Sequence, residues 1–469
     1  MNTRCWVLGA GCWGRLAATL ALLAGPLAAQ QRQSPPEGGR PRDFRVPAGR
    51  TVQLDNGMGL NFVQYGSVPK ATVLLIVRSG NLNETAAQVW LSDLMTDLMR
   101  EGTTSRSAAD ISAQSAAMGG DVFTGTGLDQ SSVQGDVLGE SVPDMIRLVA
   151  DVALHPAFPE SELARLKANR ARNLAVQLRQ PGSLTLKSFR EAMYPDHPYG
   201  RIFPTLDQLN GYTLQQIKDF YAANWGAARA QLYIVGRFDE RAAEAAAREA
   251  FGPWQRGPDP VMNVPTPVAR RALVTNDRPQ APQSTITLGV PVANPSSADW
   301  IPMVVTNTLL GGYFSSRITA NIREDKGYTY SPFSQLSTRY RDTYWAEQAD
   351  VTTASTGASL HEIFYEIDRL RNEAPPPADL SSAQNYLSGI FVLNNSSRFG
   401  IANQLGFVKL QGLDRAYLTN YVHNVMAVTP ADVQRMAQTY LDPGKILISV
   451  TGDLNVIREQ IAPYATVTP

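Results

Sequence analysis

The residue types that most often perform catalysis or bind metals are scarce in this chain. There are only four histidines, namely His155, His197, His361 and His423. No two of them stand three or four residues apart, so no helix can present two imidazoles on one face to a metal ion. Both cysteines, Cys5 and Cys12, lie near the start of the chain, in a segment that we expect to be removed. The mature chain would then have no disulfide and no thiolate nucleophile or ligand.

The carboxylates of Asp93 and Asp97 stand four residues apart, which places them on one face of a helix. We interpret them as two carboxylates on an exposed helix face. A metal site built on both carboxylates is the alternative, although the sequence shows no third ligand for it. His197 lies in a proline-rich turn, and we expect it to form structural hydrogen bonds.

Composition excludes several classes of protein. The 469 residues are too many for one ordinary domain and suit two or three. Hydrophobic residues make up 43% of the chain and charged residues 18%, which supports packed cores and excludes a wholly disordered protein. Lys and Arg together number 42, as do Asp and Glu. Without an excess of either charge, nothing indicates binding to nucleic acid or to an acidic membrane surface.

The start of the chain has the features of an export signal. The stretch 1–29 contains no acid, carries Arg4 and Arg15, and has an apolar core that ends in small residues. These features predict a cleaved signal peptide, because the apolar core is shorter than the roughly 20 residues of a membrane-spanning helix. No later stretch approaches about 18 consecutive apolar residues. We therefore expect a periplasmic or secreted protein without a membrane span.

The rest of the chain divides into two similar parts. Residues 30–50 are rich in Pro, Gly and Arg and predict an extended lead-in, and residues 254–270 predict a proline-rich linker. The two expected domains are 51–253 and 271–469. Matches at a constant offset of 216 indicate that these domains are repeats. The matched pairs are Thr213 and Thr429, Ile217 and Val433, Phe220 and Met436, and Gly236 and Gly452.

Both parts show the same order of expected elements. An apolar strand, at 71–77 and again at 284–290, leads into helices, and a helix that begins at a capping Thr precedes a closing strand. In the first part we also expect helices at 108–117, 142–154, 160–178 and 214–223, a hairpin of 120–126 with 131–138, and a strand at 231–235. The pattern predicts an α+β fold of two homologous domains, each a mostly antiparallel sheet layered with helices.

Four motifs stand out along the chain: Leu309–Ser331 (LLGGYFSSRITANIREDKGYTYS), Tyr194–Gly200 (YPDHPYG), Leu154–Phe158 (LHPAF) and Glu101-Gly102-Thr103. In their sequences and their order they resemble the pitrilysin/insulinase-type zinc peptidases. The resemblance is strongest to two-domain members such as the mitochondrial processing peptidase subunits, and it covers about residues 50–460.

This chain departs from that family at the zinc motif. The family's catalytic helix carries His-x-x-Glu-His shortly before a Gly-Thr pair. In the matching window, Asp93 and Asp97 stand at the histidine positions and Thr96 at the general-base glutamate. The family's third ligand is a glutamate on a later helix, here in the region 168–178, but no Asp or Glu occurs from 163 to 190. We therefore expect this chain to hold no metal.

In the family, an Arg and a Tyr of the second domain bind the substrate beside the scissile peptide, and Arg323 and Tyr330 match them. A guanidinium and a phenol can stabilise a carbonyl oxygen that gains negative charge. The resemblance implies a non-catalytic subunit of a heteromeric zinc peptidase. A homologous partner would bear His-x-x-Glu-His and hold the zinc, and the substrate would be a peptide. The alternative is a peptide-binding scaffold without any hydrolytic role.

Two more segments are expected beside the substrate. The family binds extended peptide along an edge strand, which corresponds here to 120–126, although Gly125 should weaken this binding. The candidate contacts on this strand are Gly120, Phe123 and Thr124. Gly311 and Gly312 are expected to form a flexible or close-packed loop at the border of the substrate chamber. A phosphate-binding loop is not indicated there, because no Gly-Lys-Ser or Gly-Lys-Thr follows.

Overall fold

The computed structural model describes residues 46–465. The predicted signal peptide and most of the predicted lead-in therefore lie outside the described residues. The first strand begins at Gly49, two residues before the predicted start of the first domain at residue 51. Among the helices of the described part, none is both long and apolar enough to cross a membrane.

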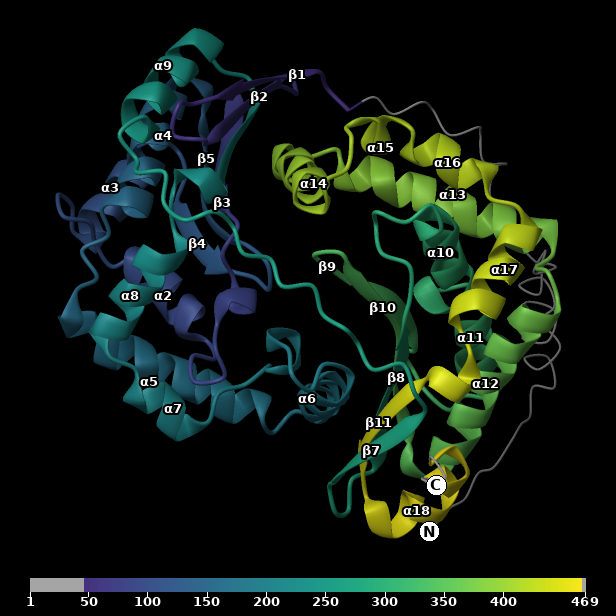
Figure 1. Cartoon of the computed structure of the whole chain (residues 1–469). Coiled ribbons are helices and arrows are strands. Elements are labelled where there is room, and N and C mark those ends of the chain that lie inside the picture. Colours follow the sequence, from purple (N-terminus) through teal and green to yellow (C-terminus); the bar gives the residue numbers. More distant parts are fainter. Residues whose placement is uncertain (1–45, 466–469) are drawn as a thin grey trace, which may run out of the picture. The chain divides into compact units, whose positions relative to one another are not determined.

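Two sheets, one in each half of the chain, form the framework of the protein (Figure 1). The first sheet contains β1 (Gly49–Gln53), β2 (Gly59–Gln64), β3 (Lys70–Val77), β4 (Val122–Thr126), β5 (Ser131–Leu138) and β6 (Ala230–Gly236). The second contains β7 (Ala272–Asp277), β8 (Gln283–Pro291), β9 (Phe333–Arg339), β10 (Asp342–Thr352) and β11 (Leu447–Gly452). Their strand orders are β1-β2-β6-β3-β5-β4 and β7-β11-β8-β10-β9.

The strand order of the second sheet repeats that of the last five strands of the first. In each sheet one pair is parallel, β2 with β6 and β7 with β11, and the other pairs are antiparallel. The predicted α+β fold of two homologous, mostly antiparallel sheets with helices is confirmed.

Helices follow the strands in each half. In the first half they are α2 (Leu91–Met99), α3 (Ala108–Ala117), α4 (Val142–Leu154), α5 (Glu160–Gln177), α6 (Pro181–Met193), α7 (Leu206–Gly211), α8 (Leu214–Asn224) and α9 (Glu240–Phe251). In the second half they are α10 (Trp300–Asn307), α11 (Arg317–Thr319), α12 (Thr356–Asn372), α13 (Pro377–Asn394), α14 (Arg398–Gln411), α15 (Ala416–Thr419), α16 (Tyr421–Ala427), α17 (Pro430–Tyr440) and α18 (Leu454–Ile461). The hydroxyls of Thr213 and Thr429 cap α8 and α17, as the repeat predicts.

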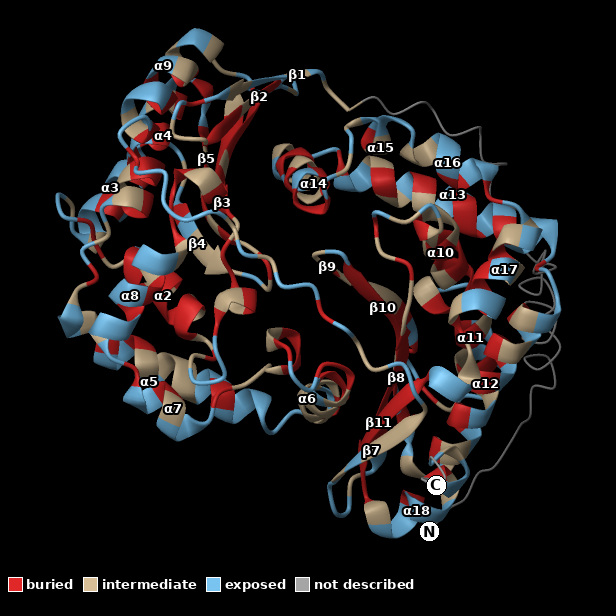
Figure 2. Cartoon of the chain, viewed as in Figure 1, coloured by how far each residue is buried: buried red, intermediate tan, exposed pale blue. Residues whose placement is uncertain are grey.

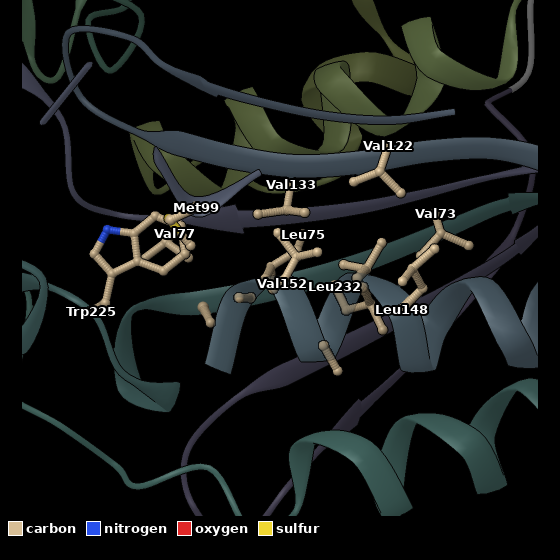
Figure 3. Packing of buried hydrophobic residues seen from close by; sticks show 14 of the residues in the cluster. Val73, Leu75, Val77, Met99, Val122, Val133, Leu148, Val152, Trp225 and Leu232 are labelled. Atoms are coloured by element: carbon tan, nitrogen blue, oxygen red, sulfur yellow. The ribbon is translucent and has the colours of Figure 1, made fainter. Parts of the chain in front are cut away.

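The main core of the first half lies between one face of its sheet and its own helices (Figure 3). Alternate residues of β3, including Val73 and Leu75, point into this core. The residues between them, Leu74 and Ile76, belong to a second buried cluster on the other face of the sheet. Figure 2 shows the result, in which β3 is buried along almost its whole length.

Each sheet buries its second face against a helix from the other half of the chain. α6, from the first half, packs against β7, β8 and β11 of the second sheet, where Phe189 is fully buried. α14, from the second half, packs against β3 and β6 of the first sheet and buries Ile401 there. At the start of α14, Arg398 forms an ion pair with Asp136 of β5, with Nη2 at 2.9 Å from Oδ2. The two halves therefore complete each other's layers.

The Tyr194–Gly200 motif also joins the halves. Tyr194 and Tyr199 place their rings 5.4 and 5.3 Å from the guanidinium of Arg339, which is 2% exposed at the end of β9. The ring of Tyr344 lies 4.6 Å from the same group. His197 accepts a hydrogen bond from the main-chain N–H of Tyr199 at 3.2 Å, so its predicted structural role is confirmed.

We expect Ile401→Ala to lower the free energy of unfolding by about 2–4 kcal/mol, because truncation of a fully buried side chain leaves a cavity under α14. Denaturant titration followed by tryptophan fluorescence measures the change. The control is Phe399→Ala on the same helix, since Phe399 is 45% exposed and should cost less than about 1 kcal/mol. Equal losses in both variants would contradict the packing of α14 on the first sheet.

Candidate functional site

The residues at the zinc-motif positions lie on α2, and two of them face α5. The guanidinium of Arg170 on α5 places Nη1 3.1 Å from Oδ1 of Asp93 and Nε 2.7 Å from Oδ2 of Asp97. It also donates to the main-chain oxygen of Asp93 at 3.3 Å. The side chains of Asp93 and Asp97 are only 17% and 33% exposed. The expectation of two carboxylates on an exposed helix face is therefore wrong, because the basic helix α5 covers that face.

Burial and charge oppose each other in this cluster. Burial raises the pKa of Asp93 above its ordinary value, and the charge of Arg170 and a hydrogen bond from Asn81 offset part of that rise. Burial alone would lower the pKa of Arg170, but hydrogen bonds and charge from Asp97 and Asp93 raise it above its ordinary value. The guanidinium thus keeps its charge between the two carboxylates.

A buried glutamate fixes the start of α2. Glu84 accepts hydrogen bonds from the main-chain N–H groups of Trp90 at 3.1 Å and Ser92 at 2.8 Å. The pKa of Glu84 is raised to about 8, because the effect of burial, together with the charge of Asp93, outweighs the hydrogen bonds from Ser92 and Trp90, which lower it. Trp90 has a φ of 68°, which is rare for a bulky residue, and its ring lies 5.9 Å from the guanidinium of Arg170. Glu84 gave no sequence signal, because it acts on the helix from a preceding loop.

The residues present do not fit a zinc ion. The donors are two carboxylates without an imidazole or a thiolate, and a guanidinium charge between them repels a metal cation. The hydroxyl of Thr96 is used within the fold, donating to the main-chain oxygen of Asp93 at 3.0 Å and lying 3.1 Å from Oγ1 of Thr126. Within residues 46–465, no group of three or more His, Cys, Asp and Glu side chains could hold a metal ion.

The predicted peptide-binding strand, β4, lies at the edge of the first sheet and pairs with β5. Thr124 turns toward α2 and donates to the main-chain oxygen of Thr96 at 2.7 Å. Phe123 is 49% exposed and lines a surface cavity of about 560 Å³ together with Val68 and Phe399. The edge position of β4 is confirmed, while its binding of peptide stays a prediction.

The predicted glycines have close neighbours. A Cβ at Gly120 would lie 2.0 Å from the main-chain oxygen of Asp136, so this glycine is required by packing. A Cβ at Gly311 would lie 2.6 Å from Oε2 of Glu347, a fully buried carboxyl whose pKa burial raises well above its ordinary value. Gly311 and Gly312 end a π-helical turn (Thr308–Gly312). Of the two expectations for this loop, the contacts favour the close-packed one.

Arg323 and Tyr330 meet on the surface of the second half. Arg323 lies on another π-helical turn (Ala320–Asp325), a feature that often marks functional sites. Its guanidinium packs over the rings of Phe314 and Tyr330, at 4.6 and 4.7 Å from their centres. Phe314 is 61% exposed and Tyr330 78% exposed. Sequence reasoning missed Phe314, although it stands inside the matched motif two residues after Gly312.

The two groups of predicted site residues remain separate. Asp93, Thr96 and Asp97 lie on α2, which contacts α5, α8 and β4 of the first half. The turn that carries Arg323 contacts α11 and α12 of the second half. Among the residues that the structure describes, no hydrogen bond or ion pair joins the two groups. The contacts that hold Arg323 and Tyr330 in place come from the second half.

Comparison with known proteins adds a family assignment for both halves. Residues 63–203 match the family model described as Insulinase (Peptidase family M16), and residues 211–387 match the Peptidase M16 inactive domain. An uncharacterized zinc protease of Streptomyces coelicolor is 25% identical over 400 residues, which are 84% of this chain and 87% of that protein. An uncharacterized zinc protease of Bacillus subtilis is 23% identical over 409 residues, covering 85% and 98%.

Solved structures share the fold at low sequence identity. A peptidase M16 inactive domain from Pseudomonas fluorescens has a TM-score of 0.80 and 22% identity, and the match covers 86% of this chain and 98% of that one. A chain of complex III2 from Candida albicans has a TM-score of 0.73 and 14% identity, covering 89% and 100%. These likenesses show the fold.

We expect Arg170→Met to lower the free energy of unfolding by about 2 kcal/mol near neutral pH, because two half-buried carboxylates lose their counter-charge. The attraction exists only while the carboxylates are ionised. The folded pKa of Asp93 is already raised and should rise further in the variant, so the loss should shrink as the pH falls through it.

Urea titrations of both proteins at about pH 7.5 and about pH 5 measure this dependence. Arg172→Met, at an exposed position of the same helix, is the control and should show little change at either pH. A loss that stays the same at both pH values would mean that Arg170 acts through packing and not through charge.

Proposed function

Because the chain belongs to the M16 (insulinase) peptidase family, we propose that it is a non-catalytic subunit of a heteromeric zinc metallopeptidase. The contrast between its two candidate sites carries the proposal. On α2 a guanidinium neutralises the residues at the metal-ligand positions, whereas the half-buried Arg323 stacks on the exposed Tyr330, and no hydrogen bond or ion pair within residues 46–465 joins this pair to α2.

In this proposal, Arg323 and Tyr330 complete an active site whose zinc ligands belong to a homologous partner. The zinc, bound in the partner, would activate a water molecule for attack on a peptide bond. The rings of Phe314 and Tyr330 pack against the guanidinium of Arg323, which also forms an ion pair with Glu324 at 3.0 Å. A donor that is held in place before the substrate arrives stabilises developing negative charge with little reorganisation. Phe314 is thus a positioning residue for Arg323.

Two observations that do not involve the site residues support the proposed partnership and the proposed location. One structure of the same fold is a chain of complex III2, so this fold occurs in a complex. Export to the periplasm or secretion is supported by the sequence of residues 1–29 alone.

A second candidate function is peptide binding without hydrolysis. It is favoured by β4, an edge strand that can extend its sheet with a peptide, and by the half-exposed Phe123 beside a cavity. Val68 and Phe399 give this cavity further apolar surface for a peptide side chain. In this case Arg323 and Tyr330 would contact peptide but would not affect the rate of any reaction.

The isolated chain, without residues 1–29, should bind no stoichiometric zinc and cleave no peptide. The reason is the donor set of Asp93, Thr96 and Asp97 with Arg170 between the carboxylates. Elemental analysis of the pure protein and a peptidase assay with and without chelator check both points. One tightly held zinc per chain, together with chelator-sensitive cleavage, would show that this chain is itself a catalytic subunit.

In the reconstituted complex, Arg323→Ala should lower kcat by about 100- to 1000-fold, the usual cost of removing a preorganised oxyanion donor. Tyr330→Phe should also lower kcat, although it keeps the ring that stacks on Arg323. Turnover is measured at saturating subunit ratio, with the partner's zinc content as a check on its integrity. The control is Tyr365→Phe, at a tyrosine of the second half that is 50% exposed. Full activity in both site variants would contradict a role in catalysis and would favour the scaffold function.

A further inference from the structure

Within the described part of the chain, the second sheet has no counterpart of β1. In the first sheet, β1 pairs along its whole length with β2, from Gly49 opposite Val63 to Gln53 opposite Gly59. In the second sheet, β7 takes the place of β2 and pairs with β11 on its inner side. No strand of the described residues pairs with its outer side. The outer side of β7 therefore offers unpaired main-chain N–H and C=O groups.

This open edge carries neither Lys nor Pro, and its one charged residue, Asp277, stands at its last position. Natural edge strands often carry a Lys, a Pro or a bulge that prevents another strand from adding. The sequence of β7 is ALVTND, which has no Lys and no Pro. Its six residues correspond to roughly 20 Å of strand, enough for an extended segment of similar length.

A basic cavity borders the same edge. It has a volume of about 780 Å³ and is lined by residues of β7 and α18. The apolar part of its wall includes Leu273, Leu454 and Ile461, and the basic part consists of Arg270, Arg271 and Arg458. Among residues 46–465, no Asp or Glu lines it. Arg270 and Arg458 are exposed and form no ion pair with any residue from 46 to 465.

In the first half, β1 covers the equivalent edge, and the helix beside that edge carries an acidic residue. There, Arg50 of β1 forms an ion pair with Glu244 of α9. α9 and α18 are equivalent, because each follows the closing strand of its sheet and is capped by an aspartate, Asp239 in one and Asp453 in the other. The caps set an offset of 214, at which Arg458 corresponds to Glu244. A strand that covered β7 would therefore need an acid where β1 has an arginine.

We propose that the outer edge of β7 binds an extended acidic segment of a partner protein by strand addition. The main chain of β7 provides the pairing, and Arg458 and Arg270 form ion pairs with acidic side chains on one face of the added strand. The alternate side chains of the added strand point to the opposite face of the sheet, where Ala272 of β7 packs in an apolar cluster, so apolar residues suit those positions. This surface lies on β7 and α18, so the proposal does not depend on Arg323 or on any hydrolysis.

The test uses a fluorescein-labelled peptide of alternating Glu and Val, with fluorescence anisotropy at low ionic strength. Two further probes are the same peptide with Lys in place of Glu and the same peptide with every main-chain nitrogen methylated. We expect the Glu peptide to bind and the other two not to. N-methylation keeps the charges but removes the donors that strand pairing requires.

Charge reversal on α18 should change the preference. Arg458→Glu should weaken binding of the Glu peptide by about tenfold and strengthen binding of the Lys peptide, because it replaces an attraction with a repulsion. Arg241→Glu, at an exposed arginine of the equivalent helix α9, is the matched control and should change neither. Circular dichroism of each variant checks that the fold is kept.

Three results would overturn the proposal. The first is no binding of the Glu peptide, and the second is equal binding of its N-methylated form, which would indicate charge without strand addition. The third is a dimer of the free chain in sedimentation velocity that Arg458→Glu disrupts, without peptide binding, which would assign the edge to a second copy.

Discussion

Both faces of each sheet are apolar, and neither half of the chain buries both faces with its own helices. This constraint determines the arrangement of the rest of the molecule. Helix α6 leaves the first half to cover the second sheet, and α14 returns to cover the first. The buried Arg339, surrounded by tyrosines of both halves, lies at the junction that this exchange creates. The sites on α2 and around Arg323 are held by layers that each half could not complete alone.

On α2, the positive charge beside the two carboxylates comes from a side chain. Carboxylates that are half-buried and close together need a positive charge nearby, and Arg170 supplies it from the next helix. These ion pairs help to hold α2 against α5, although the residues that form them are not those of a zinc site. Thr96, at the position of the family's general base, serves the packing of α2 on β4.

The sequence predicted local features well and long-range ones poorly. Hydrophobic periodicity located β3, α4 and other elements within two residues, because it reports directly on local structure and burial. It could not assign α6 and α14 to the opposite sheets, since an amphipathic pattern does not say which surface it will cover. Arg170 lies in the region that the family resemblance indicated, but its pairing with Asp93 and Asp97 depends on how two helices pack. The exposed stack of Phe314 on Arg323 likewise depends on tertiary structure.

The exchange of helices has a consequence for how the chain folds during synthesis. Arg398, which anchors α14, follows its partner Asp136 by 262 residues. The first half leaves the ribosome with the apolar face of β3 and β6 still uncovered, and it stays so until most of the second half has been made. Contacts between residues so far apart slow folding, and apolar surface exposed in the meantime promotes aggregation. The nascent first half should therefore depend on a chaperone until α14 has emerged.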